Sequence, residues 1–340
     1  MLHRTVCFGE LLLRLGAPGR ERFLQSPELC VHVGGAEANV ALALAQWGHD
    51  VAFVSAVPDN ALADAALAVL RGRRVDVTRV QQRPGRMALY FLEIGAGARA
   101  SKVVYDRAGS SFSRTGDEHY DWRALLAGAH RLHLSGITPA LSLDAAKAAI
   151  AAASAARELG MDVVFDGNFR PSLWAVRDTD PQPVLRELFA LATTAFAGAR
   201  DIDLVLGTQA STTADPYTDF ERAASRAFDA FPSLQRLVCT TRTVHTADRY
   251  SLGALHARRD GAIVRADDLA LDGIVDRIGG GDAFAAGVLH GIDSGWTDAR
   301  AVAFGLAASV LKHTVPGDFL IATEADVMAV VEGEPADVRR

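Results

Sequence analysis

Three consecutive glycines followed by an aspartate have the clearest chemical potential in this sequence. Gly279, Gly280, Gly281 and Asp282 lead into Ala283–Gly295, an apolar, alanine-rich stretch typical of a helix. Glycines let the backbone bring its N–H groups close to a ligand, and the positive end of a helix favours an anion. With a carboxylate beside such a cradle, the pattern indicates phosphoryl transfer to a hydroxyl. A glycine-rich turn with an ordinary aspartate N-cap is the structural alternative.

A glycine pair near the N-terminus opens a second stretch of this kind. Its six residues are Gly34, Gly35, Ala36, Glu37, Ala38 and Asn39. Val40–Trp47 continues as an apolar, alanine-rich run that stops at Gly48, which predicts a helix. The pair would let a ligand approach the start of that helix, where Glu37 and Asn39 offer polar groups. A tight turn with acidic capping is the alternative.

A third group of polar residues follows a predicted strand. Asp162–Phe165 is an apolar strand pattern, and the sequence D-G-N-F-R-P comes directly after it. Ligands of open α/β sheets bind outside the carboxyl ends of the strands, so Asn168 and Arg170 are well placed for binding. A polar turn before Pro171 would explain the same residues.

The elements that must position these residues alternate between strands and helices. The predicted strands include Thr5–Phe8, Asp50–Val57, Val75–Val80, Arg131–Ser135, Asp203–Leu206 and Arg236–Thr241, and the predicted helices between them include Ala61–Arg71, Leu143–Leu159, Pro181–Leu191 and Asp219–Phe231. This alternation predicts an α/β fold with a mainly parallel sheet.

One segment departs from the alternation. Met87–Ile94 and Ser101–Tyr105 are strand-like and are separated by G-A-G-A, which predicts an antiparallel hairpin that stands off the sheet as a flap. Leu11–Val33 mixes charged and apolar residues with turn signals, so we expect irregular structure there, with a strand near Cys30–Val33.

Composition excludes several classes of protein. The 340 residues carry a net charge of −6, which argues against a broad nucleic-acid surface. No apolar run reaches the roughly 18 residues of a membrane span, and the N-terminus lacks a signal-peptide pattern. Three scattered cysteines fit reduced thiols, so we expect a cytoplasmic protein. Walker, protein-kinase, zinc-protease and hydrolase-elbow motifs are missing from the sequence.

Two motifs together carry a family resemblance. Asp276–Phe284 reads D-R-I-G-G-G-D-A-F, close to D-T-x-G-A-G-D-x-F, and Gly34–Asn39 reads G-G-A-E-A-N, matching G-G-x-x-x-N. On these motifs the sequence resembles the ribokinase-like (PfkB) family of carbohydrate kinases over nearly its whole length. Further stretches look like the 2-keto-3-deoxygluconate kinases of that family, namely Tyr105–Arg107, Ser135–Ala140, Asn168–Arg170 with Leu173-Trp174, and Lys312–Asp318.

The resemblance implies a role for each matching residue. Asp282 would be the general base for the primary hydroxyl of the sugar, and the three glycines before it would form the anion hole. The residues that would line the sugar pocket or close it from the flap are Gly34, Gly35, Ala36, Glu37, Ala38, Asn39, Tyr90, Tyr105, Asp106, Arg107, Arg170 and Asp318. The residues that would bridge to the nucleotide or contact it are Asn168, Phe169, Arg170, Thr240, Gly279, Gly280 and Gly281.

Two departures from the family pattern concern the phosphate end. Arg277 stands in place of the signature threonine. The family's N-x-x-E motif, which helps hold Mg²⁺ and phosphate through water, is expected after the Asp203–Leu206 strand. There Gly207–Ser211 reads G-T-Q-A-S, with Thr208 and Ser211 at the places of the motif's polar residues. The resemblance therefore implies ATP and Mg²⁺ as cofactors, while the metal ligands remain unassigned.

A charge argument favours a sugar acid as the substrate. The planar guanidinium of arginine suits a carboxylate, and Arg107 and Arg170 are the candidates to bind one. A neutral sugar would leave these charges unpaired in a dry site, which selects against it. The resemblance to the 2-keto-3-deoxygluconate kinases, which this argument supports, implies ATP-dependent phosphorylation of 2-keto-3-deoxy-D-gluconate to its 6-phosphate.

The expected architecture is a single ribokinase-like, three-layer kinase domain over residues 1–340, with a β lid from parts of 11–33 and 86–107. An exposed lid edge could pair with a second subunit. Three alternatives stay open: a kinase of the same family for fructose, ribose or another sugar acid, a non-catalytic sugar-binding protein on the same fold, and a Schiff-base aldolase. The last needs a desolvated lysine on a barrel strand, a context that Lys102, Lys147 and Lys312 lack.

Overall fold

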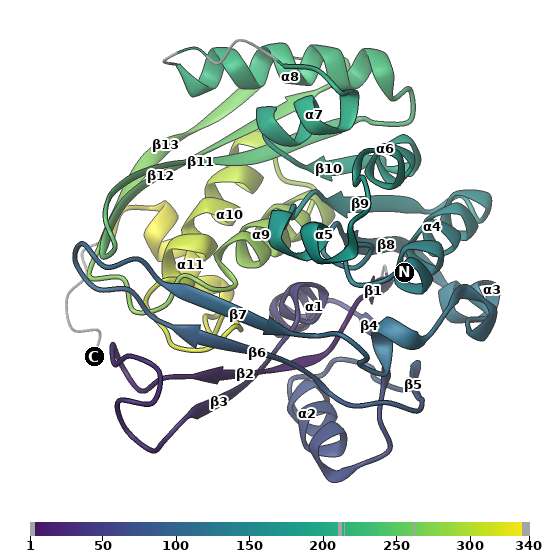
Figure 1. The fold of residues 1–340 in the computed structure, drawn as a ribbon. Helices are drawn as coiled ribbons and strands as arrows, with labels where there is room; N and C mark the ends of the chain where they lie inside the picture. The colour runs from purple at the N-terminus through teal and green to yellow at the C-terminus, as the bar shows by residue number, and fades with distance from the viewer. Residues whose placement is uncertain (1–3, 210–212, 214, 262, 335–340) are drawn as a thin grey trace.

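Two sheets organise the chain (Figure 1). In the described residues, 4–209, 213, 215–261 and 263–334, a computed structural model shows a nine-stranded sheet with the order β13-β12-β11-β10-β9-β8-β1-β4-β5. Its strands are β1 Arg4–Phe8, β4 Val51–Val57, β5 Val80–Gln82, β8 Ala129–Ser135, β9 Asp162–Asp166, β10 Thr194–Phe196, β11 Arg236–Thr246, β12 Arg249–Arg258 and β13 Ile263–Asp272. Neighbouring strands from β5 to β11 are parallel, and β12 and β13 are antiparallel additions at one edge.

Helices cover both faces of this sheet (Figure 1). The α-helices are α1 Ala36–Gln46, α2 Ala61–Gly72, α3 Trp122–Leu126, α4 Leu143–Glu158, α5 Pro171–Arg177, α6 Gln182–Leu191, α7 Ala199–Leu206, α8 Pro216–Ala230, α9 Gly280–Asp293, α10 Asp298–Lys312 and α11 Glu324–Val331, with short 3₁₀ turns at Phe112–Arg114 and Asp117–His119. Side chains alternate across each strand, so Cys7 of β1 joins the core with α1, α9 and α10, while Val6 and Phe8 join the core with α4 and α6. The result is the three-layer α/β architecture that the alternation predicts.

The large sheet has its topological switch point between β1 and β8. The chain leaves β1 toward β4 and β5 on one side and later returns to build β8, β9, β10 and β11 on the other side. Strand order reverses at this point, which is where open parallel sheets bind their ligands. Gly9 and Glu10 follow β1, while Ser135 ends β8 and Asp166 ends β9. The residues after these strands are therefore positioned to form a site.

A four-stranded sheet, here called the lid, lies against one side of the body. Its order is β3-β2-β6-β7, from β2 Leu12–Gly16, β3 Cys30–Gly34, β6 Ala88–Glu93 and β7 Lys102–Asp106. The predicted hairpin corresponds to the antiparallel pair β6–β7. The prediction of irregular structure before Cys30 was wrong at β2, which pairs in parallel with β6. Four side chains in register, His32, Arg14, Tyr90 and Tyr105, form a row across the lid.

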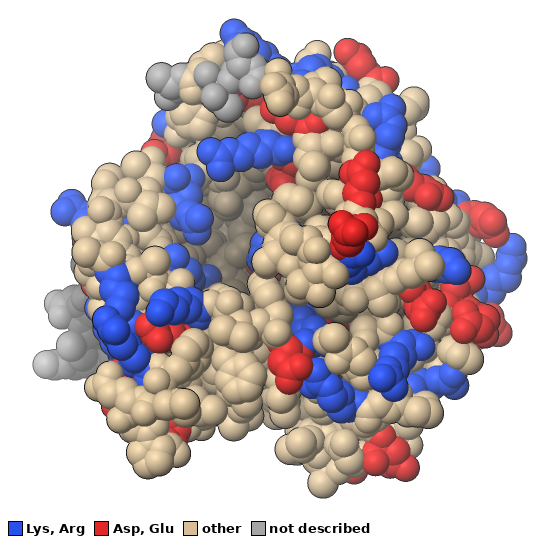
Figure 2. Space-filling model, in the orientation of Figure 1, with Lys and Arg blue, Asp and Glu red and all other residues tan. Residues whose placement is uncertain are grey.

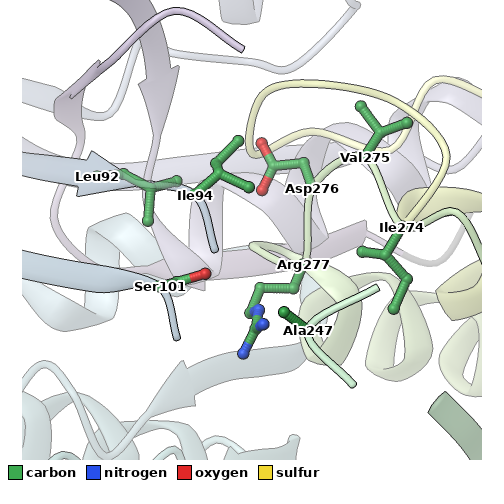
Figure 3. A pocket seen from close by; sticks show the side chains of 8 residues that line it. All are labelled: Leu92, Ile94, Ser101, Ala247, Ile274, Val275, Asp276 and Arg277. Atoms are coloured by element: carbon green, nitrogen blue, oxygen red, sulfur yellow. The ribbon is translucent and has the colours of Figure 1, made fainter. Parts of the chain in front are cut away.

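The lid meets the body beside a small pocket (Figure 3). Leu92, Ile94 and Ser101 line it from the lid, and Ala247 with Ile274–Arg277 lines it from the body. At the lid tip, the amide of Ala247 donates to the carbonyl of Gly97 at 2.9 Å. These contacts join the lid to the turn between β11 and β12.

Two predicted strands differ from the structure. Asp203–Leu206 belongs to helix α7, and the strand of the sheet lies earlier, at β10. Ile202 and Val205 are buried at a helical spacing of three residues, and the Asp201 carboxylate accepts the Gly198 amide, which fixes the first turn. Strand β5 begins only at the end of the predicted Val75–Val80 run. Within the described part of the chain, every helix is too short or too polar to cross a bilayer.

Candidate active site

Two of the three glycines at the start of α9, Gly279 and Gly280, are packed too closely to accept a side chain, whereas Gly281 faces open space. Gly279 has φ +82°, and a Cβ there would lie 2.0 Å from the carbonyl oxygen of Asp318. A Cβ on Gly280 would lie 2.6 Å from the Cε1 atom of His313. Helix α9 begins at Gly280, so the unsatisfied N–H groups of its first turn open at this loop. Backbone amides and the helix dipole make the loop suited to an anion.

Asp282 lies in the first turn of α9 and is joined to the second glycine motif. Its Oδ2 atom accepts a 2.6 Å hydrogen bond from the side-chain amide of Asn39 on α1. Burial raises the pKa of Asp282 to about 6, against the lowering effects of the Asn39 hydrogen bond and of the charges of Arg170 and Lys312. At neutral pH the carboxylate is thus mostly ionised and has the pKa of an effective general base.

A cavity of about 980 Å³ opens onto the glycine loop. Figure 2 shows the hollow, with Lys and Arg side chains along its upper and left edges. The predicted nucleotide residues that line it are Asn168, Phe169, Arg170, Thr240, Gly280 and Gly281. Asn168 has φ +32°, a left-handed conformation that turns the chain out of β9 toward the cavity. The volume is at the upper end of the range for small-molecule sites.

Two carboxylates that the sequence analysis did not select also line this cavity. Asp166 ends β9, and burial together with the negative charge of Asp282 raises its pKa to about 8. Asp201 begins α7, where its carboxylate accepts the Gly198 amide at 2.8 Å and burial raises its pKa. The strand before this turn is β10, so Gly198 and Asp201 occupy the places of Asn and Glu in N-x-x-E.

The prediction that the N-x-x-E position follows Asp203–Leu206 was wrong, because those residues end helix α7 and the strand before the motif is β10. Thr208 is exposed at the far end of α7, where it bonds to Asp203 and Arg226, and Ser211 lies outside the described residues. Among the described side chains, no group of three His, Cys, Asp or Glu residues is arranged to hold a metal alone. Mg²⁺ usually uses one or two carboxylates with water and phosphate oxygens, and Asp166 and Asp201 fit that requirement.

Asp318, a predicted sugar-pocket residue, lies at the centre of a buried polar cluster. Its Oδ2 atom accepts a 2.8 Å hydrogen bond from the Tyr90 hydroxyl, and its Oδ1 lies 3.1 Å from Nη1 of Arg14. A Cβ on Gly34 would lie 2.2 Å from the same carboxylate, which explains the glycine. Burial raises the pKa of Asp318 to about 6. The centre of the Tyr105 ring lies 6.4 Å from the centre of the Tyr90 ring.

Arg14 links Asp318 to the glycine signature. Its Nη2 lies 2.6 Å from Oδ2 of Asp276, the first residue of the glycine signature, and all three charged side chains are almost fully buried. Asp276 also accepts the backbone amides of Ile278 and Gly317 at 3.0 Å. The lid, the signature loop and Asp318 are thus held by one buried ion network.

Other predicted pocket residues have structural partners. Glu37 is buried and accepts from Ser135 N and Oγ and from Thr138 Oγ1, at 3.0, 2.7 and 3.1 Å. It fixes the end of β8, and burial raises its pKa to about 7. Ala38 is fully buried against the core. Gly35 has φ +143° and is packed where a Cβ would lie 2.3 Å from the carbonyl oxygen of Glu10.

Three charged residues of the predicted pocket differ in their partners: Asp106 at the end of β7, Arg107 directly after it, and Arg170 after β9. Arg107 is buried, and its Nε lies 2.6 Å from Oε2 of Glu10. Glu10 follows β1 of the large sheet, so this ion pair fixes the orientation of the Arg107 guanidinium. Asp106 is exposed and pairs with Arg86 on the lid. Arg170 is exposed and donates a 3.3 Å hydrogen bond to the carbonyl of Phe169. Arg170 lines the large cavity, whereas Asp106 and Arg107 are not part of its lining.

Comparison with known proteins gives one consistent answer. The family model for pfkB family carbohydrate kinases matches residues 2–322. The chain is 31% identical over 340 residues, all of both chains, to a 2-dehydro-3-deoxygalactonokinase from Haloferax volcanii. It is 30% identical over 320 residues to a 2-dehydro-3-deoxygluconokinase from Thermoproteus tenax, covering 92% of this chain and 89% of that one.

The structural comparison agrees. A solved 2-dehydro-3-deoxygluconokinase from Thermotoga maritima superposes with a TM-score of 0.90 at 34% identity, over 97% of this chain and 100% of that one. The ribokinase-like fold and the family resemblance predicted from the two glycine motifs are confirmed. This protein belongs to the pfkB family of carbohydrate kinases.

Proposed function

We propose that this carbohydrate kinase transfers the γ-phosphoryl group of ATP to the 6-hydroxyl of 2-keto-3-deoxy-D-gluconate. One observation carries the proposal: a base, an anion site and a pocket with arginines lie together at the start of α9. Asp282 provides the base, and the Gly279–Gly281 amides provide the anion site. Relatives named for 2-dehydro-3-deoxy sugar acids support the substrate class.

Asp282 takes the proton of the attacking hydroxyl in this scheme. Its raised pKa increases its basicity, and the Asn39 amide holds the carboxylate in one orientation. The Oδ1 atom of Asn39 is buried and has no hydrogen-bond partner among the described residues, so it is an acceptor for a substrate hydroxyl. In-line attack then needs only the two substrates aligned and the developing charge stabilised.

The carboxylate of the sugar acid would bind to Arg107 and Arg170. Glu10 holds Nε of Arg107, so its guanidinium keeps a fixed plane, while Arg170 approaches from the end of β9. Tyr90, Tyr105, Asp318 and the tightly packed Gly34 and Gly35 would close the rest of the pocket. Asp106 and Glu37 would support it indirectly, through Arg86 and through Ser135 and Thr138.

ATP would occupy the large cavity, with a divalent cation that we propose to be Mg²⁺. Asp166 and Asp201 would hold the cation, partly through water, and it would neutralise phosphate charge when bound. Both carboxyls are half-buried with raised pKa values, and among the described residues neither forms an ion pair, although the charge of Arg170 acts on both, so a divalent cation fits there. Asn168, Phe169 and Thr240 would line the nucleotide side of the cavity.

A second candidate substrate is the epimeric acid, 2-keto-3-deoxygalactonate. The full-length match to a 2-dehydro-3-deoxygalactonokinase favours it specifically. Both acids present the same carboxylate to Arg107 and Arg170. The test is kcat/KM for the two acids, fructose and ribose. The proposal expects a sugar acid to exceed both neutral sugars, and a neutral sugar in first place would overturn it.

We also propose that the lid forms the contact of a homo-oligomer. Val31 on β3 and Val103 and Val104 on β7 are exposed on the two edge strands of the lid. Exposed apolar edge strands are ready to pair with another chain. The solution mass, measured with and without substitution of Val104 by lysine, tests this: an oligomer that dissociates in the variant supports it, and a monomeric wild type contradicts it.

A further inference from the structure

Two arginines line the cavity beside the glycine loop and have no acidic partner. Arg242 lies on β11, and Arg277 lies between β13 and α9. In the part of the chain that the structure describes, neither guanidinium forms an ion pair or hydrogen bond. The other arginine of β11, Arg236, lies 4.0 Å from Asp298, and Arg249 on the neighbouring strand β12 is paired with Asp272. Two unpaired positive charges at one cavity indicate an anionic ligand.

Tyr250 positions both guanidiniums. The Cζ atoms of Arg242 and Arg277 lie 5.5 and 5.4 Å from the centre of its ring. The ring is fully buried and meets the His313 ring edge-on at 6.4 Å, so it is a rigid platform. Cation–π contact limits the directions that each side chain samples. The pair is thus held in place before any ligand arrives.

The Arg242 and Arg277 guanidiniums lie close to the glycine loop, with His313 beside them. His313 packs where a Cβ on Gly280 would stand. Burial lowers the pKa of His313, and the charges of Lys312, Arg242 and Arg277 lower it further. The imidazole is therefore neutral at pH 7. The two guanidiniums and the loop amides share one electropositive region.

The neighbouring aspartate does not cancel this charge. Asp276 is bound by Arg14 at 2.6 Å and by two backbone amides. Figure 3 shows the Arg277 side chain extending away from the Asp276 carboxylate. Arg277 also lines the main cavity, so its guanidinium is available to a ligand there.

We propose that Arg242 and Arg277 form a clamp that binds the phosphate chain of ATP at the entrance to the anion site. The inference rests on the proposed kinase function and adds a phosphate-binding pair to it. The guanidinium fork matches phosphate oxygens with two parallel hydrogen bonds. Gly198 supplies no side-chain amide at its place in the altered N-x-x-E motif. The clamp provides phosphate contacts that this motif lacks.

The test is direct binding of a non-hydrolysable ATP analogue, with Mg²⁺ and without sugar, measured by calorimetry. Arg277→Gln and Arg242→Gln should each weaken the analogue about tenfold, the effect of losing a charge-assisted hydrogen bond. AMP, which lacks the outer phosphates, should bind within about threefold of wild type. Arg249→Gln is the matched control, since Arg249 precedes Tyr250 on β12 and pairs with exposed Asp272.

Retained AMP binding shows that a variant is folded, and Arg277→Lys keeps the charge if glutamine disturbs the loop. Analogue affinity within about twofold of wild type in both glutamine variants would overturn the clamp. The result is independent of sugar turnover. If wild type binds the analogue and the variants lose it, the clamp stands even when every sugar of the panel fails, which would instead refute the proposed substrate.

Discussion

The side-chain amide of Asn39 lies 2.6 Å from the carboxylate of Asp282, although 243 positions separate the two residues. This bond joins the start of α1 to the start of α9, so the two glycine motifs form one site. The amide also stabilises the ionised form of Asp282, which opposes the effect of burial. The pH dependence of turnover should therefore change when the hydrogen bond between Asn39 and Asp282 is removed.

Replacing Asn39 with alanine should move the acid limb of the pH–kcat profile. In the wild type, turnover should fall below about pH 6 as Asp282 takes up a proton. Loss of a hydrogen bond to a charged group raises the pKa of the acid, so the limb of Asn39→Ala should shift upward by about one pH unit. Asn60→Ala, which removes the N-cap of α2, is the control and should leave the profile in place. An unchanged limb in Asn39→Ala would refute the coupling.

Replacing Arg14 with alanine should destabilise the fold strongly. The change would leave Asp276 and Asp318 buried without their cation, at a cost of about 3–5 kcal/mol. The free energy of unfolding in denaturant measures it. Arg20→Ala is the matched control, because Arg20 is 44% exposed in its pair with Asp248 and should cost less than about 1 kcal/mol. Equal losses in the two variants would contradict the buried network.

Asp166 should make the unliganded protein less stable as the pH rises. Its folded pKa of about 8 lies above the ordinary aspartate value of 3.8, so between these pH values the folded protein keeps a proton that the unfolded chain has lost. That contribution to stability is present at low pH and is lost as the pH rises through about 8. Asp166→Asn should therefore exceed the wild type in unfolding free energy at pH 8 by at least about 1 kcal/mol.

The difference between Asp166→Asn and the wild type should vanish below pH 4, which denaturant unfolding at a series of pH values will show. The amide oxygen of Asn can still accept the Asn168 backbone amide, now 3.1 Å from the carboxylate. Asp162→Asn, at the exposed start of the same strand, is the control. A wild type at least as stable as Asp166→Asn at pH 8 would count against this account.

Gly279→Ala should abolish phosphate binding, whereas Gly273→Ala should not. Both glycines have positive φ, +82° and +69°, so alanine meets similar backbone strain at the two sites. Only at Gly279 would the new Cβ meet another atom, the Asp318 carbonyl oxygen at 2.0 Å, while Gly273 faces open space. Calorimetry with the ATP analogue separates the effects. Normal binding by Gly279→Ala would show that the loop is not the anion site.

The sequence predicted those parts of the site whose chemistry is local. Glycine runs with an adjacent Asp or Asn indicate close backbone approach, and alternating apolar runs indicate the sheet. Asn168 and Arg170 directly follow a strand and line the cavity, and their contacts with a ligand stay a prediction. Asp166, two residues before Asn168, carries no such signal in the sequence, because only tertiary packing brings Asp282 near it.

The sequence did not predict the site residues whose partners are distant in the chain. Arg14 reads as a lone charge in an apolar run, and only pairing between β2 and β6 reveals its ion network. Asp201 was missed because D-I-D-L-V-L suits a strand or a helix equally, and its capping contact with Gly198 settles the choice. Glu37 was expected in the pocket, but packing turns it toward Ser135 and Thr138.

The most direct test of the central claim is turnover of 2-keto-3-deoxygluconate with ATP by the wild type and by Asp282→Asn. Asparagine keeps the shape of the side chain and removes the base, so kcat should fall at least about 100-fold while the ATP analogue still binds. Turnover by the wild type, together with this loss of kcat in Asp282→Asn, would support Asp282 as the base of a sugar-acid kinase. Near-normal kcat in Asp282→Asn would contradict it.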